Sequence, residues 1–386
     1  MTSETTPPLS AGTAAEGFES LREAFDTVLA ADPEHAAQVA VYADGRQVVD
    51  LWGGPLITGD SLLGVFSSTK GAAHLSVALL VQDGALDLDK EVRHYWPEFA
   101  AEGKESITLR TLITHQAGLI GTDAGFSAEE AVDDRAMAAL LAAQRPFWRP
   151  GTAHGYHGMT IAALTGELVF RTTGLSLAEY YARHIGDARG VDLFIGLPGT
   201  HEHRVLDVQP MRTTAAQRAA LAVGAEAPGS LSGIAFNRHR APASADEPLP
   251  RAVLAAGPAS YGGTSSARGL ARMYANAIST VDGRPPLLTA STAAEFAQPH
   301  SVGQDLVLRR PTAFGLGFQS YGDRMPFLSA GAFGHDGYGG SLGFADPRTG
   351  LAFGYVRRSI PFPGGLGEDV ITLAKAATFC AAAATE

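Results

Sequence analysis

Ser67 and Lys70 stand three residues apart in the segment Ser67-Ser-Thr-Lys70, which fits the pattern S-x-x-K. Residues i and i+3 lie on one face of a helix, so the lysine amine can reach the serine hydroxyl. A desolvated lysine has a lowered pKa and can accept the proton that a nucleophilic serine must lose. The helix N-terminus adds backbone N–H groups that stabilise an oxyanion. The pattern is short, however, and by itself it also describes a capped helix with a surface lysine.

Two later segments have residue types that complement this pair. Tyr156 lies in Pro150-Gly-Thr-Ala-His-Gly-Tyr-His-Gly158, a loop that enters an apolar helix. His335-Asp-Gly337 precedes a predicted hairpin, and glycine permits close approach of a strand to a substrate. Taken singly, the first is also explained by a loop tyrosine bonded to a backbone group, and the second by a flexible turn.

Together and in this order, the three segments resemble the serine β-lactamase and penicillin-binding superfamily, and within it the class C-like family VIII carboxylesterases. Members carry S-x-x-K, then Tyr-x-Asn or Ser-x-Asn, then Lys-Thr-Gly or a variant of it. The corresponding segments here are Ser67-Ser-Thr-Lys70, Tyr156-His-Gly158 and His335-Asp-Gly337. The resemblance covers roughly residues 20–380.

The resemblance implies a serine esterase that forms an acyl-enzyme. Ser67 would attack the ester carbonyl, while Lys70 and Tyr156 share its proton, with Tyr156 as base and then as acid to the leaving alkoxide. The backbone N–H groups of Ser67 and Tyr338 would form the oxyanion hole. Water activated by the same pair would then release the acid.

Two departures from the family pattern bear on the substrate. Gly158 replaces an amide-bearing asparagine, and His335 replaces the lysine that would pair a substrate carboxylate. An imidazole is a poor substitute for an ammonium group. We therefore expect short-acyl esters as substrates and little or no β-lactam turnover, with the substrate-binding residues His335, Asp336, Gly337, Trp148 and Gly158.

The distribution of strand and helix signals predicts how these residues are positioned. Strand patterns flank an Asp44-Gly45 turn and a Pro347–Gly350 turn, and Phe314–Tyr321 is a further strand candidate. Apolar periodicity predicts helices over 15–31, from Ser67 to about residue 80, and over 366–384, with Ser67 or Ser68 capping the second.

These signals predict an α/β + α protein with a serine β-lactamase-like fold. Helices would flank an antiparallel sheet built from both chain ends, and a mainly helical domain would be inserted between them. The predicted division is a mobile tail over 1–14, a discontinuous α/β domain over 15–84 and 312–386, and a helical domain over 85–311. The active site is expected in the cleft between the two domains.

The composition limits the partners. The chain of 386 residues has a formal charge of −11 and no basic run, which disfavours a nucleic-acid partner. Its single cysteine, Cys380, cannot form an internal disulfide. We expect no signal peptide, no membrane span, no cofactor and no metal, and a small-molecule ester as ligand in a cytoplasmic protein of unknown oligomeric state.

Several other readings remain open. Gly339-Gly-Ser341-Leu-Gly343 matches G-x-S-x-G, but a strand is predicted after it and no histidine follows, which disfavours a nucleophile elbow. His201-Glu-His203 lacks a third metal ligand, and we expect structural roles for His115 and His157. Rival functions are amide or D-amino-acid peptide hydrolysis, acyl transfer, and a non-catalytic binding module.

Overall fold

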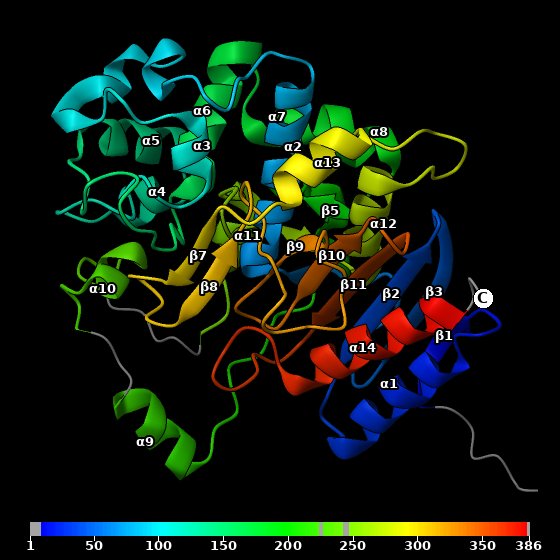
Figure 1. Cartoon of the computed structure of the whole chain (residues 1–386). Helices are drawn as coiled ribbons and strands as arrows, with labels where there is room; N and C mark the ends of the chain where they lie inside the picture. Colours follow the sequence, from blue (N-terminus) through cyan, green and yellow to red (C-terminus); the bar gives the residue numbers. More distant parts are fainter. Residues whose placement is uncertain (1–8, 224–226, 242–246, 384–386) are drawn as a thin grey trace, which may run out of the picture.

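The sheet at the base of the molecule is built from both ends of the chain (Figure 1). The computed structural model describes residues 9–223, 227–241 and 247–383. Neighbouring strands are antiparallel throughout. In spatial order they are β1 (Ala11–Ala14), β3 (Arg46–Gly53), β2 (Ala37–Ala43), β11 (Leu351–Arg357), β10 (Leu342–Asp346) and β9 (Phe333–Asp336). The pairing of β2 with β11 joins the two chain ends, as predicted.

Both predicted hairpins are confirmed. The β2–β3 turn is made by Asp44 and Gly45, which both have positive φ, at 48° and 76°. Two positive φ values are the requirement of the tight turn that matches the twist of paired strands. The β10–β11 hairpin places Leu342 opposite Tyr355 and Asp346 opposite Leu351.

Two predictions about strands are wrong. Residues 11–14 form β1 at the edge of the sheet rather than a mobile tail, while residues 1–8 of that tail lie outside the described residues. The candidate strand over 314–321 does not form: β8 ends at Phe314, and Gln319 makes only isolated bridges. The chain bends at Gly317, whose φ is 79° and whose α-carbon lies against the ring of His74.

Helices cover both faces of the sheet. On one face lie α1 (Glu19–Ala31) and α14 (Glu368–Ala383), side by side in Figure 1. Their buried stripes join the sheet residues in one core, in which α1 contributes Leu21, Phe25 and Leu29 at helical spacing. The opposite face packs on α12 (Ala267–Ile278), which contacts β2, β10 and β11.

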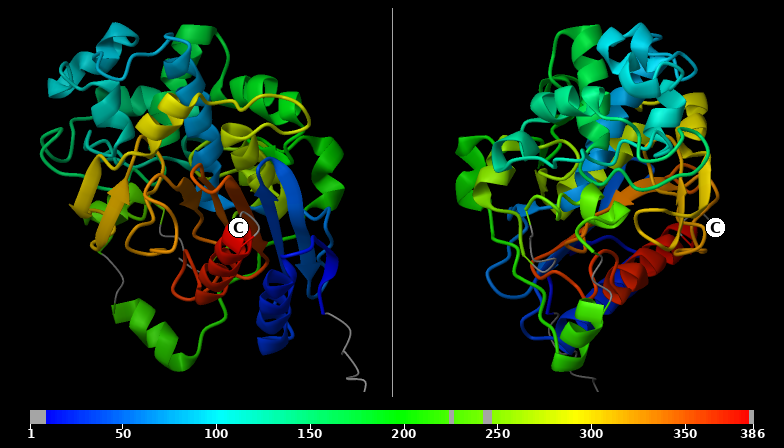
Figure 2. Two further views of the ribbon diagram at one scale, coloured as in Figure 1. Left: turned by 45° about the vertical axis from the view of Figure 1, so that its right-hand side comes forward. Right: turned by 90° about the vertical axis from the view of Figure 1, so that its left-hand side faces the viewer.

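Most of the remaining helices form a second region above the sheet, clearest in Figure 2. Helix α9 (Ala215–Val223) instead lies apart from them, at the bottom of Figure 1. At the centre of the second region α2 (Thr69–Gln82), in which twelve residues are buried, packs against α6 and α7. The other helices are α3 (Leu109–Ile113), α4 (Ala128–Ala131), α5 (Asp134–Ala143), α6 (Ile161–Thr173), α7 (Leu177–Tyr181), α8 (Asp187–Arg189), α9 (Ala215–Val223), α10 (Leu231–Ala235), α11 (Arg251–Ala256) and α13 (Ala290–Ala297).

Two smaller sheets complete the fold. One has the order β4 (Leu63–Gly64), β6 (Thr264–Ser265) and β5 (Leu193–Phe194), and the other pairs β7 (Ser301–Gln304) with β8 (Pro311–Phe314). The domain boundaries at residues 84 and 312 stay a prediction. In the structure, α12 from the predicted helical domain covers the sheet, and α2 from the predicted α/β domain packs into the helical region. Among the described residues, no helix combines the length and apolarity needed to cross a bilayer.

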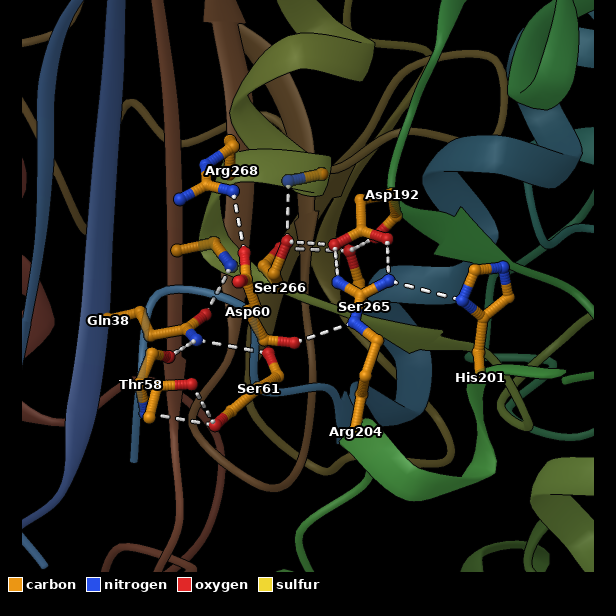
Figure 3. Close-up of polar contacts among 12 residues, drawn as sticks. Gln38, Thr58, Asp60, Ser61, Asp192, His201, Arg204, Ser265, Ser266 and Arg268 are labelled. Carbon is orange, nitrogen blue, oxygen red and sulfur yellow. Dashed lines mark hydrogen bonds and ion pairs between the residues drawn. The ribbon is translucent and has the colours of Figure 1, made fainter. Parts of the chain in front are cut away.

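A polar network ties the start of α12 to surrounding loops (Figure 3). Asp192 accepts hydrogen bonds from the Arg204 guanidinium, at 2.9 Å, and from the Ser266 hydroxyl, at 3.0 Å. The amide of Gln38 on β2 donates to the Ser61 carbonyl, and its oxygen accepts the N–H of Ala267. These contacts anchor α12, and with it strand β6, which is paired to the strand that leads into the Ser67 segment.

Candidate active site

Ser67 lies in a 3-10 turn, Phe66–Ser68, that leads directly into α2. Phe66 has a φ of 48°, a left-handed conformation that turns the chain sharply just before the serine. Ser67 is half-buried and opens on a cavity of about 470 Å3 that Tyr156, Gly158 and Tyr338 also line. Neither serine of the turn caps α2 with its side chain, so that prediction is wrong.

Lys70 is completely buried one turn into α2. Its Nζ lies 3.3 Å from Ser67 Oγ and 2.7 Å from each of two backbone carbonyl oxygens, those of Gly158 and Ser260. Burial holds the pKa of Lys70 well below its usual 10.5, and the charge of Asp336 only partly opposes this. A neutral amine has two N–H bonds and one lone pair. With the two carbonyls accepting both N–H groups, the lone pair is left for the Ser67 hydroxyl.

Tyr156 is held in the cavity wall by its backbone and its ring. Its N–H donates to the Asp305 carboxylate at 3.1 Å, and its ring stacks on Phe314 with centroids 5.8 Å apart. Its ring centre lies 4.9 Å from Lys70 Nζ. The buried hydroxyl makes no hydrogen bond within the described residues. Burial raises the pKa of Tyr156, and the neighbouring Ser67 side chain lowers it by less.

Ser68 and Ser341 join the first and third motifs. The Ser68 hydroxyl lies 2.9 Å from that of Ser341 and also donates to the His335 carbonyl, while Ser341 donates to the Val65 carbonyl at 2.8 Å. A Cβ on Gly337 would lie 2.2 Å from the Val65 carbonyl oxygen. The close approach that requires glycine is therefore to the Ser67 segment, not to a substrate. Ser341 is buried in this contact and followed by β10, which contradicts the nucleophile-elbow reading.

The third motif places its side chains differently from the prediction. Asp336 lines the cavity, with its carboxylate 3.5 Å from the Arg324 guanidinium. His335 is fully buried behind Tyr156, with ring centroids 6.0 Å apart, and Nδ1 donates to the Asp336 carbonyl. Burial and then the positive charge of Lys70 hold the pKa of His335 well below 6.5. A neutral imidazole behind the wall does not fit the expected role in substrate binding.

The two remaining predicted substrate-binding residues differ in whether they line the cavity. Gly158 lines the cavity, but Trp148 does not. The indole of Trp148 donates to the Ala153 carbonyl at 3.1 Å and supports the loop that carries Tyr156 from behind.

His115 and His157 hold that same loop in place. The Leu119 N–H donates to His157 Nε2, so the proton is on Nδ1, which donates to the Gly155 carbonyl at 2.7 Å. His115 Nδ1 in turn accepts the backbone N–H of His157. Burial holds the pKa of His157 at about 4, so both rings act as neutral hydrogen-bonding groups, as we expected from the sequence.

Most of the cavity wall was not identified from the sequence. Phe66 and Met159 line it next to the first and second motifs in the sequence. The other lining residues come from segments that carry no motif and reach the site only through the fold, namely Phe236, Arg238, Glu247, Tyr261, Leu308, Arg310, Gln319, Pro363, Gly364 and Gly365.

Comparison with known proteins is consistent with this geometry. EstA from Arthrobacter nitroguajacolicus Rue61a is 42% identical, with 97% of this chain and 99% of that chain covered and a TM-score of 0.90. A solved family VIII carboxylesterase is 31% identical, with 96% and 99% covered and a TM-score of 0.83. The esterase/beta-lactamase LipL of Mycobacterium tuberculosis is 30% identical over 371 residues, which are 91% of this chain and 83% of that protein.

The family model described as Beta-lactamase matches residues 21–365, a span that holds all three motifs. The match extends over both the sheet and the helical region, and the structural likeness to the solved relatives covers nearly the whole chain. The chain therefore belongs to the beta-lactamase family.

Proposed function

We propose that the protein is a serine carboxylesterase that hydrolyses small or short-acyl esters through an acyl-enzyme on Ser67. The observation that carries the proposal is the setting of Lys70, buried without an ionic partner among the described residues and aimed at Ser67 Oγ by two backbone carbonyls. The related EstA and the family VIII carboxylesterase support an ester substrate.

The directions of the two pKa shifts support the following proton transfers. Because burial lowers the pKa of Lys70 and raises that of Tyr156, the lysine is the group that is neutral and basic before the reaction. The Ser67 proton passes to Lys70 as Oγ bonds to the ester carbon. Tyr156, still protonated, gives its proton to the leaving alkoxide as the ester C–O bond breaks, and regains one from Lys70. This differs from the expectation that Tyr156 is the first base.

The oxyanion is proposed to be held by the backbone N–H groups of Ser67 and Tyr338, which both line the cavity. Removing one such donor typically costs about 3 kcal/mol of transition-state stabilisation. In the second half-reaction a water takes the place of the alcohol and loses its proton to the same pair. We further expect a small ester as ligand, no nucleic-acid partner and a cytoplasmic location.

The proposal is tested with p-nitrophenyl acetate and a fluorophosphonate probe, followed by mass-spectrometric mapping of the labelled peptide. We expect ester turnover and an adduct on Ser67, both abolished by Ser67→Ala and unchanged in the exposed-serine control Ser106→Ala. An adduct on Ser341 would contradict the assigned nucleophile. The absence of both turnover and adduct would favour a binding module instead.

A further inference from the structure

The ring of Phe236 occupies the space next to Gly158 in the cavity wall. A Cβ on Gly158 would lie 2.7 Å from Cε1 of Phe236 and within 3.4 Å of two further ring carbons. No side chain can enter at position 158 while the ring is there. The two residues thus form a matched pair, in which the missing side chain makes room for an aromatic ring.

Neighbouring residues fix the ring in this position. Phe236 follows the last residue of α10, and the next residue, Asn237, is buried. The Asn237 side chain accepts the N–H of Phe126 at 2.8 Å and donates to the Phe126 carbonyl at 2.9 Å. The guanidinium carbon of Arg238 lies 5.7 Å from the centre of the Phe236 ring. The ring is therefore a fixed part of the wall.

The ring lines the same cavity as the nucleophile. Phe236 contacts Gly158, whose carbonyl accepts a hydrogen bond from Lys70, and Lys70 is 3.3 Å from Ser67 Oγ. During the proposed reaction the alcohol leaves, while the acyl group remains bonded to Ser67. The acyl group, which stays bonded to Ser67 for the whole cycle, is proposed to lie against this wall.

We infer that Phe236 is a specificity-determining residue that selects ester substrates with an apolar acyl group over those with an amide-bearing one. Its ring offers a face for stacking and no hydrogen-bonding group, so an amide buried against it loses its hydration without compensation. This inference rests on the proposed esterase function and names the substrate class of that same site.

Two substrates of equal length isolate this effect. The p-nitrophenyl esters of 4-phenylbutanoic acid and hippuric acid differ by an ethylene unit in place of an amide, with the phenyl ring and leaving group unchanged. We expect the wild type to favour the 4-phenylbutanoate in kcat/KM, and Phe236→Ala to lower this preference about tenfold. The control Phe379→Ala removes the same ring from an exposed position on α14 and should leave the ratio unchanged.

Paired substitution tests the match between the two residues. Gly158→Asn alone should lose activity toward both esters, because the new side chain collides with the Phe236 ring. Combining it with Phe236→Ala removes the collision and places an amide beside the acyl group. We expect the double variant to regain activity and to favour the hippurate relative to the wild type.

The outcomes are distinct. A wild type that hydrolyses both esters, with a ratio unmoved in Phe236→Ala, overturns the specificity inference and leaves the esterase function intact. A wild type that hydrolyses neither ester and takes no fluorophosphonate label overturns both. If the alanine variant fails to fold, Phe236→Gln, which fills the wall with a side chain that can hydrogen-bond an amide, should give the same fall in ratio.

Discussion

At the scale of single residues, the site shows how burial distributes protons between two groups with similar ordinary pKa values. Lys70 and Tyr156 are both enclosed, and burial penalises whichever form is charged, so the amine is pushed toward neutrality and the phenol is kept protonated. Each group thus begins the reaction in the form that its proposed step needs.

Replacing Lys70 with arginine tests whether the residue at this position must act as a base. Lys70→Arg introduces a permanent positive charge that cannot be lost by deprotonation, so kcat/KM should fall about a thousandfold. Lys90→Arg, an exposed lysine on the surface, should leave kcat/KM unchanged. The measurement is initial-rate hydrolysis of p-nitrophenyl acetate, with circular dichroism to verify folding. Activity retained in Lys70→Arg would contradict a neutral-lysine base.

The pH profile distinguishes the two candidate bases. Protonated Lys70 cannot accept the serine proton. The profile of kcat/KM against pH should therefore have an acid limb, in which kcat/KM rises with pH through the lowered pKa of Lys70. The residual activity of Tyr156→Phe should keep this acid limb at the same pH. If the limb disappears in that variant, Tyr156 rather than Lys70 is the titrating base.

At the scale of elements, the positions of the proposed catalytic groups depend on how tightly the third motif packs against the start of α2. The end of β9 and the 3-10 turn are joined by the hydrogen bond from Ser68 to the His335 carbonyl, and Gly337 lies against the Val65 carbonyl with no room for a side chain. The distance between the Ser67 and Tyr338 N–H groups is set by this contact.

A methyl group at Gly337 should force the two elements apart. In Gly337→Ala the Cβ meets the Val65 carbonyl and the Ser341 hydroxyl, so we expect a loss of about 2 kcal/mol in the free energy of unfolding. We also expect kcat to fall in the protein that remains folded. Gly331→Ala is the matched control, because a Cβ there meets no atom within 4 Å. Urea unfolding and ester turnover provide the two readouts, and equal behaviour of both variants would contradict this account.

The sequence predicts elements that depend on local patterns, but not contacts between segments that are distant in the chain. The hairpins and the serine–lysine pair follow from local patterns, since two turn residues or one helical turn fix their geometry. The edge strand β1 has the segment Ala-Gly-Thr-Ala, with no apolar alternation, and its pairing depends on the β3 backbone. Phe236 and Arg310 reach the cavity from distant segments, and no pattern of residue spacing in the sequence predicts such a contact.

At the scale of the whole molecule, buried histidines make the fold sensitive to acid. Burial is the largest cause that lowers the pKa of His74, to about 3, and of His35 and His157, to about 4, from 6.5. The unfolded chain therefore binds more protons than the folded one below pH 6.5, so stability falls as the pH drops from 6.5 toward 4. Asp134, whose pKa burial raises to about 6, works in the opposite direction.

We expect the free energy of unfolding to fall by at least about 4 kcal/mol between pH 7 and pH 5, since these three histidines outweigh one carboxyl group and the buried His115 and His335 act in the same direction. Urea titrations at fixed ionic strength across this range measure it. His203→Gln, which removes an exposed histidine, should leave the slope unchanged. A free energy that is flat over these two units would contradict neutral burial of the histidines.

The sheet formed from both chain ends has a consequence for biosynthesis. While the ribosome is still translating the helical region, the β2–β3 hairpin exposes the edge that β11 will later occupy, from Ala37 to Ala43. That edge gains its partner only after residue 357 has left the exit tunnel. A nascent chain thus carries Ser67, Lys70 and Tyr156 long before it has the strand that bears the third motif, and hydrolytic activity should appear only near the end of translation.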